Sequence, residues 1–203
     1  MQERESLIWR TFIEGNKSSY QELMESNYSA LFNYGSKFSE NNELIKDCIQ
    51  DLFMNLWYKR ETISREVHIK AYLFSSLRRL LHRKIASDEK YQYSSMDTRF
   101  IDSFAFNVSI EQQIITNEST LSLAKKIAAS LQNLPNRQKE VIYLKYFHNF
   151  SRDQIAQTMN ISPQTVSNLL QIALKKLRST FKDNFDPRSL FLLIPLIVNK
   201  ITF

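Results

Sequence analysis

Glycine and proline are scarce in this 203-residue chain, which contains two of the first and four of the second. A sheet of many strands needs such residues at its turns, so their scarcity argues against a β-rich fold. Leucine, lysine, glutamine and glutamate, all good helix formers, are plentiful instead. The composition predicts an all-α protein, and the length favours two small helical domains over one large domain.

Cysteine and histidine are also rare, which limits the chemistry open to the chain. The single cysteine, Cys48, cannot form an internal disulfide and lies in a periodic helical stretch, where we expect a buried structural thiol. The three histidines, His68, His82 and His148, show no paired metal-ligand spacing. A glycine-rich phosphate loop and a nucleophile elbow are missing as well. We therefore expect no enzymatic activity, no metal or other cofactor, and no small-molecule substrate.

Long apolar runs are missing too. The first ten residues, MQERESLIWR, lack the apolar core of a secretory signal, so we expect a cytoplasmic protein. The apolar run from Leu190 to Val198 contains Pro195 and is shorter than the about 20 residues that a membrane-spanning helix needs. Three roles stay open for this C-terminal tail: a helix docking on the second domain, a segment that binds a regulator, or an anchor at a membrane surface.

Charge is distributed in blocks along the chain. Residues 65–90 carry a net charge of +4 and residues 125–182 carry +8, whereas residues 1–64 and 91–124 carry −3 each. Clustered Lys and Arg favour a polyanionic partner, because phosphates release counterions when they are neutralised. The two basic blocks therefore indicate two nucleic-acid surfaces, although solvated helix faces can have the same composition.

The first half of the chain shows helical periodicity. Apolar residues recur at helical intervals from about Tyr20 to Arg60, interrupted by the polar stretch SENNE, and predict two amphipathic helices packed as a hairpin. A third helix begins near His68, with an apolar stripe and a basic opposite face. The predicted stripe of the third helix is Ala71, Tyr72, Phe74, Leu77, Leu80 and Leu81, and its basic face is Lys70, Arg78, Arg79, Arg83 and Lys84.

The periodicity stops between about residues 86 and 117, where the sequence is polar and rich in serine and aspartate. We interpret this stretch as a flexible linker. The predicted organisation is therefore a first domain over residues 1–88, a linker over 89–118, a second domain over 119–182 and an apolar tail over 183–203.

The second domain contains the most specific pattern, a helix-turn-helix. Pro135 marks the start of a preceding helix, Ser151 is a candidate N-cap, and Ser162 followed by Pro163 is a second helix start.

Three positions of the motif carry strict demands. A small residue must lie where the two helices touch, the turn four residues later needs a residue that tolerates positive φ, and an apolar anchor six residues beyond must face the first helix. Ala156, Asn160 and Val166 meet these demands, and Asn is among the few residues other than glycine that visit the left-handed region.

The second helix of the motif then exposes polar side chains. If Val166, Leu170, Ala173, Leu174 and Leu177 face inward, its outward residues have the chemistry of base readers, because Gln and Asn can bond adenine twice and Ser and Thr can bond bases or phosphates. Those outward residues are Gln164, Thr165, Ser167, Asn168 and Gln171, followed by the backbone-binding candidates Lys175, Lys176 and Arg178.

Residues 131–178 resemble region 4 of sigma-70 family factors. The resemblance rests on an LP opening at Leu134 and Pro135, an IA pair at Ile155 and Ala156, a TV pair at Thr165 and Val166, and the closing KKLR of residues 175–178.

The first domain resembles region 2 of the same family. The stretch DCIQDLFMNLWYKRE is similar to the segment that grips the coiled coil of the largest polymerase subunit, and IKAYLFSSLRRLLHRK is similar to the helix that captures the −10 promoter element. No region 3 is present, which is typical of the small extracytoplasmic-function group, and the sequence is most similar to Bacteroidetes members.

The resemblance implies a sigma factor that directs promoter-specific transcription initiation, with core RNA polymerase, promoter DNA and an anti-sigma factor as partners. Asp47, Gln50 and Asp51 share one helix face and would bind the polymerase. Tyr72 or Phe74 could stack on an unpaired base or pack in the core. The implied −10 contacts are Lys70, Tyr72, Arg78, Arg79, Arg83 and Lys84, and the implied −35 contacts are Arg152, Gln164, Thr165, Ser167, Asn168, Gln171 and Lys175.

The sequence also departs from the family pattern. Arg79 and Arg83 stand where members often carry Asn and Asp, and Ser167, Leu169 and Ile172 stand where basic residues are frequent. We therefore expect modest affinity for the −35 element, and we hypothesise that an anti-sigma protein covers Leu169 and Ile172. The alternative function is a stand-alone helix-turn-helix regulator that binds an operator, with the N-terminal helices used for dimerisation or signal sensing.

Overall fold

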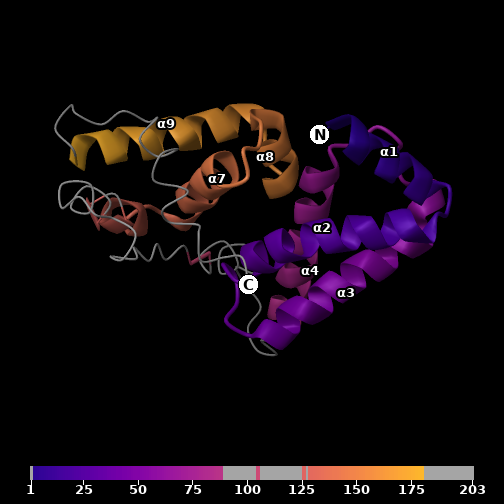
Figure 1. Cartoon of the computed structure of the whole chain (residues 1–203). Coiled ribbons are helices and arrows are strands. Elements are labelled where there is room, and N and C mark those ends of the chain that lie inside the picture. The colour runs from indigo at the N-terminus through magenta and orange to yellow at the C-terminus, as the bar shows by residue number, and fades with distance from the viewer. Residues whose placement is uncertain (1, 89–103, 106–124, 127, 181–203) are drawn as a thin grey trace, which may run out of the picture. The chain divides into compact units, whose positions relative to one another are not determined.

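The computed structural model describes residues 2–88, 104–105, 125–126 and 128–180, and most of these residues lie in helices (Figure 1). No strand occurs in the described residues, which confirms the all-α prediction. The chain divides into two compact units, described separately below. The helices of the N-terminal unit are α1 (Gln2–Ile13), α2 (Lys17–Gly35), α3 (Asn42–Lys59), the 3₁₀ turn η1 (Arg60–Thr62) and α4 (Ile69–Asp88). The later helices include α7 (Asn136–Tyr146), α8 (Arg152–Met159) and α9 (Pro163–Thr180), and we call the part of the chain that contains them the C-terminal unit.

Helices α2 and α3 form the predicted hairpin. Asn16 and Asn41 cap their N-termini, because their side-chain oxygens accept hydrogen bonds from Ser19 N at 3.0 Å and from Leu44 N at 3.1 Å. Both helices pack against α4, whose stripe fills the space between them. The core of this unit includes Leu23, Leu31, Tyr34, Ile45, Ile49, Leu52, Phe53, Leu56, Ala71, Phe74, Leu77 and Leu81.

Helix α1 is an element that the periodicity from Tyr20 onward did not predict. It buries Trp9, Phe12 and Ile13, and the Trp9 indole N–H donates to the Ser64 carbonyl at 3.2 Å. The sequence does contain a helical pattern here, because Trp9, Phe12 and Ile13 are spaced by one, three and four positions. Leu7 is apolar but exposed, and it makes this pattern less regular. The N-terminal unit is therefore a four-helix assembly with an aromatic core around Trp9 and Phe12.

Cys48 lies on the inner side of α3 and is fully buried, which confirms the predicted structural thiol. Burial in apolar surroundings raises the pKa of its thiol to about 11. The charges around it act in both directions, since Lys84 lowers this pKa and Asp51 and Asp47 raise it, and they are weaker than burial.

We expect Cys48 to resist thiol reagents in the folded protein. A thiol whose pKa rises from 9.0 to about 11 has about a hundredfold less thiolate at pH 8, and the thiolate is the reacting form. Alkylation followed by mass spectrometry should show slow modification in buffer and rapid modification in concentrated urea. Rapid modification of the native protein at pH 8 would contradict the buried position.

The C-terminal unit packs α7 against α9 around Val141, Ile142 and Leu144. Phe104, which falls within the predicted linker, is buried here, with its ring edge-on to that of Tyr143 and the two ring centroids 5.9 Å apart. At least this residue of the stretch is thus part of the second hydrophobic core. The predicted domain boundaries otherwise stay a prediction.

The apolar tail of residues 183–203, for which the sequence leaves three roles open, lies outside the described residues. Within the part of the chain that the structure describes, no helix has the length and apolarity needed to span a membrane.

Candidate functional site

One face of α3 points away from the core and combines acidic with apolar side chains. Asp47 and Gln50 are exposed, and Asp51 is half-buried. Met54 and Tyr58, at 46% and 75% exposure, lie seven and eleven residues after Asp47 and therefore share its face. We call these five residues the α3 face.

Met54 and Tyr58 were not among the residues predicted to bind a partner. In a periodic helix an apolar residue is normally read as part of the core, and these two are exposed instead. Their spacing from Asp47, by multiples of 3.6 residues, is the signal that would have placed them on its face.

The Asp51 carboxylate forms an ion pair with Lys84 of α4, with Oδ2 and Nζ 2.9 Å apart. The hydrogen bond to Asp51 raises the pKa of the Lys84 ammonium. Two residues predicted to bind different partners therefore bind each other, and Lys84 lies against α3 rather than on the outward face of α4.

The remaining predicted −10 residues also differ in their surroundings. Tyr72, Arg79 and Arg83 follow one another by seven and four residues and so share the outward face of α4. Arg79 and Arg83 are exposed, and Tyr72 is half-buried, with its ring edge-on to that of Trp9 and the two ring centroids 5.9 Å apart. The predicted single basic face is wrong for Lys84, because consecutive residues such as Arg83 and Lys84 point about 100° apart on a helix.

One aromatic and one basic residue of α4, Phe74 and Lys70, make contacts within the N-terminal unit. Phe74 is 1% exposed and its ring lies 4.8 Å from that of Tyr34, so it is a core residue and not a platform for a base. Lys70 is exposed, and its Nζ lies 3.5 Å from a carboxylate oxygen of Glu5 on α1. Arg78 is half-buried.

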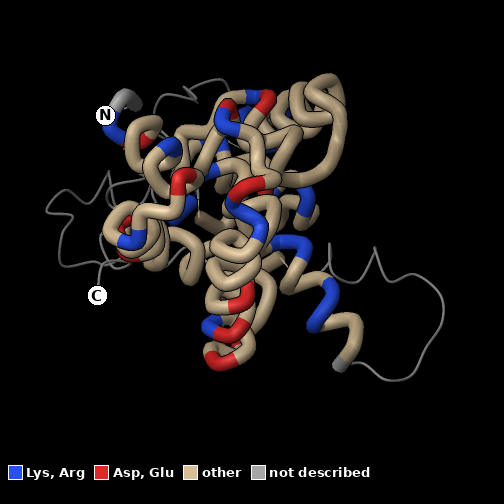
Figure 2. Tube along the Cα trace, turned by 90° about the vertical axis from the view of Figure 1, so that its right-hand side faces the viewer, with Lys and Arg blue, Asp and Glu red and all other residues tan. Residues whose placement is uncertain are grey.

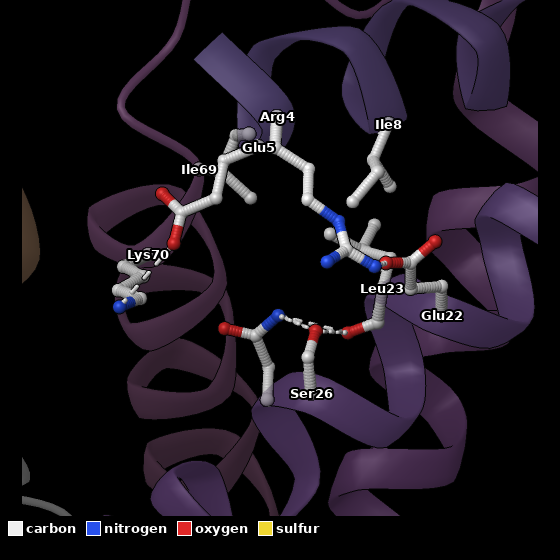
Figure 3. Close-up of a pocket in the computed structure, with 9 residues that line it drawn as sticks. Arg4, Glu5, Ile8, Glu22, Leu23, Ser26, Ile69 and Lys70 are labelled. Carbon is white, nitrogen blue, oxygen red and sulfur yellow. Dashed lines mark hydrogen bonds and ion pairs between the residues drawn. The ribbon is translucent and has the colours of Figure 1, made fainter. Parts of the chain in front are cut away.

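A pocket of about 310 Å³ lies where α1, α2 and the start of α4 meet (Figure 3). Its apolar wall includes Ile8, Leu23 and Ile69. The charged residues at its rim neutralise each other, because Arg4 pairs with Glu22 at 2.7 Å and Lys70 pairs with Glu5 at 3.5 Å. The rim therefore offers no excess charge for an ionic ligand.

The helix-turn-helix of the C-terminal unit has the predicted geometry. Ala156 of α8 is buried at 6% exposure, Asn160 has a φ of 52°, and Val166 is fully buried. Ser151 caps α8 as part of a capping box, in which Gln154 N donates to Ser151 Oγ at 3.2 Å and Ser151 N donates to Gln154 Oε1 at 2.7 Å. These features confirm the motif.

Helix α9 begins at Pro163 as expected, and Ser162 is its N-cap, since Thr165 N donates to Ser162 Oγ at 3.1 Å. The buried side of α9 contains Val166, Ala173 and Leu177, while Leu170 and Leu174 are half-buried.

Substitutions at Asn160 test whether the stability of the turn depends on its positive φ or on the asparagine side chain. Asn160→Val should lower the free energy of unfolding by about 1 to 2 kcal/mol, because a β-branched residue is strained at positive φ. Asn160→Gly should stay within about 0.5 kcal/mol of the wild type. Urea unfolding followed by circular dichroism measures both, and equal stability of the Val and Gly variants would argue against the left-handed turn.

The predicted reading residues of α9 fall into two groups. Gln164, Asn168, Gln171 and Lys175 are exposed and recur every three or four residues, so they form one stripe. In this stripe the Gln164 side-chain N–H donates to Asn168 Oδ1 at 3.1 Å.

The second group is Thr165 and Ser167, whose hydroxyls form hydrogen bonds near the start of α9. Thr165 Oγ1 lies 2.8 Å from Ser162 Oγ, and Ser167 Oγ donates to the Pro163 carbonyl at 3.2 Å. Both residues are half-buried. We expect them to support the stripe more than to read bases directly.

Helix α9 is basic, because it carries Lys175, Lys176 and Arg178 and no acidic residue. Figure 2 marks Lys and Arg in blue and Asp and Glu in red along the described residues. Arg152, at the start of α8, is exposed and its Nε lies 3.6 Å from Asp153. Beside the stripe, Ile172 is 47% exposed and Leu169 is half-buried. Among the described residues, no group of three or more His, Cys, Asp or Glu side chains is arranged to hold a metal ion.

Comparison with known families identifies both units. The profile described as Sigma-70 region 2 matches residues 23–91, and that described as Sigma-70, region 4 matches residues 124–177. Together the two matches cover more than half of the chain. No curated protein sequence matches significantly.

Two solved structures are similar in fold. A chain described as CnrH in complex with the cytosolic domain of CnrY is 18% identical with a TM-score of 0.56, and the match covers 89% of this chain and 99% of that one. The sigma factor RpoE in complex with the anti-sigma factor NepR from Bartonella quintana is 20% identical with a TM-score of 0.48, and the match covers 83% and 98%. The first of these likenesses supports the arrangement of helices.

Proposed function

Because the chain belongs to the sigma-70 family, with region 2 and region 4 in that order, we propose that it is a sigma factor of the extracytoplasmic-function group. Such a protein docks on core RNA polymerase and directs it to promoters. One observation carries the proposal: the chain combines an acidic and apolar face on α3 with a helix-turn-helix whose second helix exposes amide side chains.

The α3 face is suited to docking on a basic protein surface. Asp47, Gln50 and Asp51 supply negative charge and hydrogen-bond acceptors, which guide association and fix its register. Met54 and Tyr58 supply apolar area, and Met and Tyr are both enriched in protein interfaces. We propose that this face binds the polymerase.

The DNA-binding roles divide between α4 and α9. On α4, exposed Arg79 and Arg83 would hold phosphates of the −10 region, with half-buried Tyr72 on the same face. On α9, Gln164, Asn168 and Gln171 would read bases of the −35 element in the major groove. Arg152 and Lys175 would position the helix on the backbone.

Control by an anti-sigma factor is part of the proposal. The relative from Bartonella quintana is described in complex with such a protein. On this chain, Ile172 and Leu169 offer an apolar area beside the reading stripe, which a regulator could cover. A protein with these partners works in the cytoplasm, and its similarity to Bacteroidetes members stays a prediction.

Purification of the tagged chain with core RNA polymerase separates this function from that of a stand-alone regulator. A sigma factor should bind core polymerase at low salt and protect promoter DNA only in its presence. An operator-binding regulator should instead protect a palindromic site by itself. Protection of a palindrome together with failure to bind core polymerase would overturn the proposal.

A further inference from the structure

The ion pair between Asp51 and Lys84 joins the α3 face to α4. Its Oδ2 and Nζ atoms are 2.9 Å apart, and the two side chains are 43% and 33% exposed. Lys84 is the residue after Arg83, which points outward from α4. The pair therefore lies between the surface proposed for polymerase and the surface proposed for DNA.

Lys84 reduces the negative charge that the α3 face can present. Asp47 and Asp51 are its two carboxylates, and both act on the Lys84 ammonium, Asp51 through a hydrogen bond and Asp47 through its charge. Arg83 also acts in this region, since its charge lowers the pKa of the Cys48 thiol. A basic partner that docks on the α3 face has to share or take the carboxylate that Lys84 holds.

From this geometry we infer that Lys84 and core RNA polymerase compete for the Asp51 carboxylate, so that Lys84 is an affinity-setting residue of the α3 face. The inference rests on the proposed docking role of that face. It differs from the sequence prediction, which assigned Lys84 to DNA alone. When the polymerase takes Asp51, Lys84 is released and becomes available for a phosphate of DNA.

The competition is modest in size and reciprocal. Polymerase docking has to break the partly exposed Asp51–Lys84 ion pair. The cost of breaking it lowers the affinity for core polymerase by about two- to fivefold. Because binding effects are reciprocal, a DNA phosphate that engages Lys84 should strengthen polymerase docking by the same factor. The pair would thus couple the two steps that a promoter complex requires.

Lys84→Met tests the competition because it removes the charge and keeps the aliphatic stem. In fluorescence anisotropy with core polymerase, this variant should bind about two- to fivefold tighter than the wild type. Asp51→Asn should bind more weakly, and Lys84→Met should no longer tighten binding when Asp51→Asn is present. Arg4→Met is the matched control, since it removes one positive charge and one ion pair, Arg4–Glu22, elsewhere in the same unit. It should leave the affinity unchanged.

Two further measurements, with a −10 oligonucleotide and with Asp47→Asn, distinguish the competition from the docking role of the α3 face. A single-stranded −10 oligonucleotide should increase the affinity of the wild type for core polymerase, and part of that increase should be lost in Lys84→Met. If Asp47→Asn weakens docking while Lys84→Met leaves it unchanged or weaker, the competition is overturned and the docking face stands. If Asp47→Asn also has no effect, the proposed docking face itself fails. Thermal unfolding of each variant shows whether the fold is kept.

Discussion

The double variant Asp47→Lys/Tyr58→Ala is expected to bind core RNA polymerase at least about a hundredfold more weakly than the wild type. Reversing one charge turns an attraction into a repulsion in a face meant for a basic partner. Removing Tyr58, which is 75% exposed, deletes the largest apolar contact of the α3 face, and aromatic anchors commonly contribute about 2 kcal/mol or more to an interface. Surface plasmon resonance with immobilised core polymerase measures the loss.

Both residues lie outside the core, so the variant should keep the stability of the wild type. The matched control is Glu14→Lys/Leu7→Ala, which makes the same change of charge and truncates another exposed apolar residue at α1. It should bind like the wild type. Equal losses in the two double variants would show that net charge, and not the α3 face, governs docking.

The second large effect is expected for Gln164→Ala/Asn168→Ala on α9. Each amide can make a bidentate contact with adenine worth about 1 to 3 kcal/mol. The two side chains hydrogen-bond each other in the free protein, at 3.1 Å, and this bond must open before both can read bases. Allowing for that cost, we expect about 30-fold to 1,000-fold weaker binding of holoenzyme to a −35 element.

Loss of base reading has a signature that loss of charge does not have. Binding to unrelated DNA and the slope of affinity against salt concentration should stay unchanged, because no phosphate contact is removed. Gln132→Ala/Asn133→Ala removes two exposed amides of the same unit before α7 and is the control. A parallel fall in specific and unspecific binding would argue that α9 only contacts the backbone.

The helix-turn-helix could be predicted from the sequence because its determinants are local. Asn160 was identified as the positive-φ position from its distance to Ala156 and Val166 alone, and its φ is 52°. Caps such as Ser151 and Ser162 depend on residues three positions away, so they too can be read along the chain. Helix α1 was missed because its stripe is short and exposed Leu7 interrupts it.

What the sequence could not provide is the tertiary neighbourhood of each candidate. The Asp51–Lys84 pair joins two helices, and no spacing rule connects them. Met54 and Tyr58 have the residue types of a core, and only their exposure places them on a surface. Likewise Phe104 lies in a polar stretch, yet it is buried against Tyr143.

In vitro transcription with purified core RNA polymerase tests the central claim most directly. Added to core enzyme on a pool of promoter fragments, the wild-type chain should start transcription from a defined subset of fragments. Asp47→Lys/Tyr58→Ala should abolish these transcripts, and Gln164→Ala/Asn168→Ala should reduce them strongly. Transcripts that do not depend on the added chain, or none from any fragment despite two folded units, would contradict the assignment as a sigma factor.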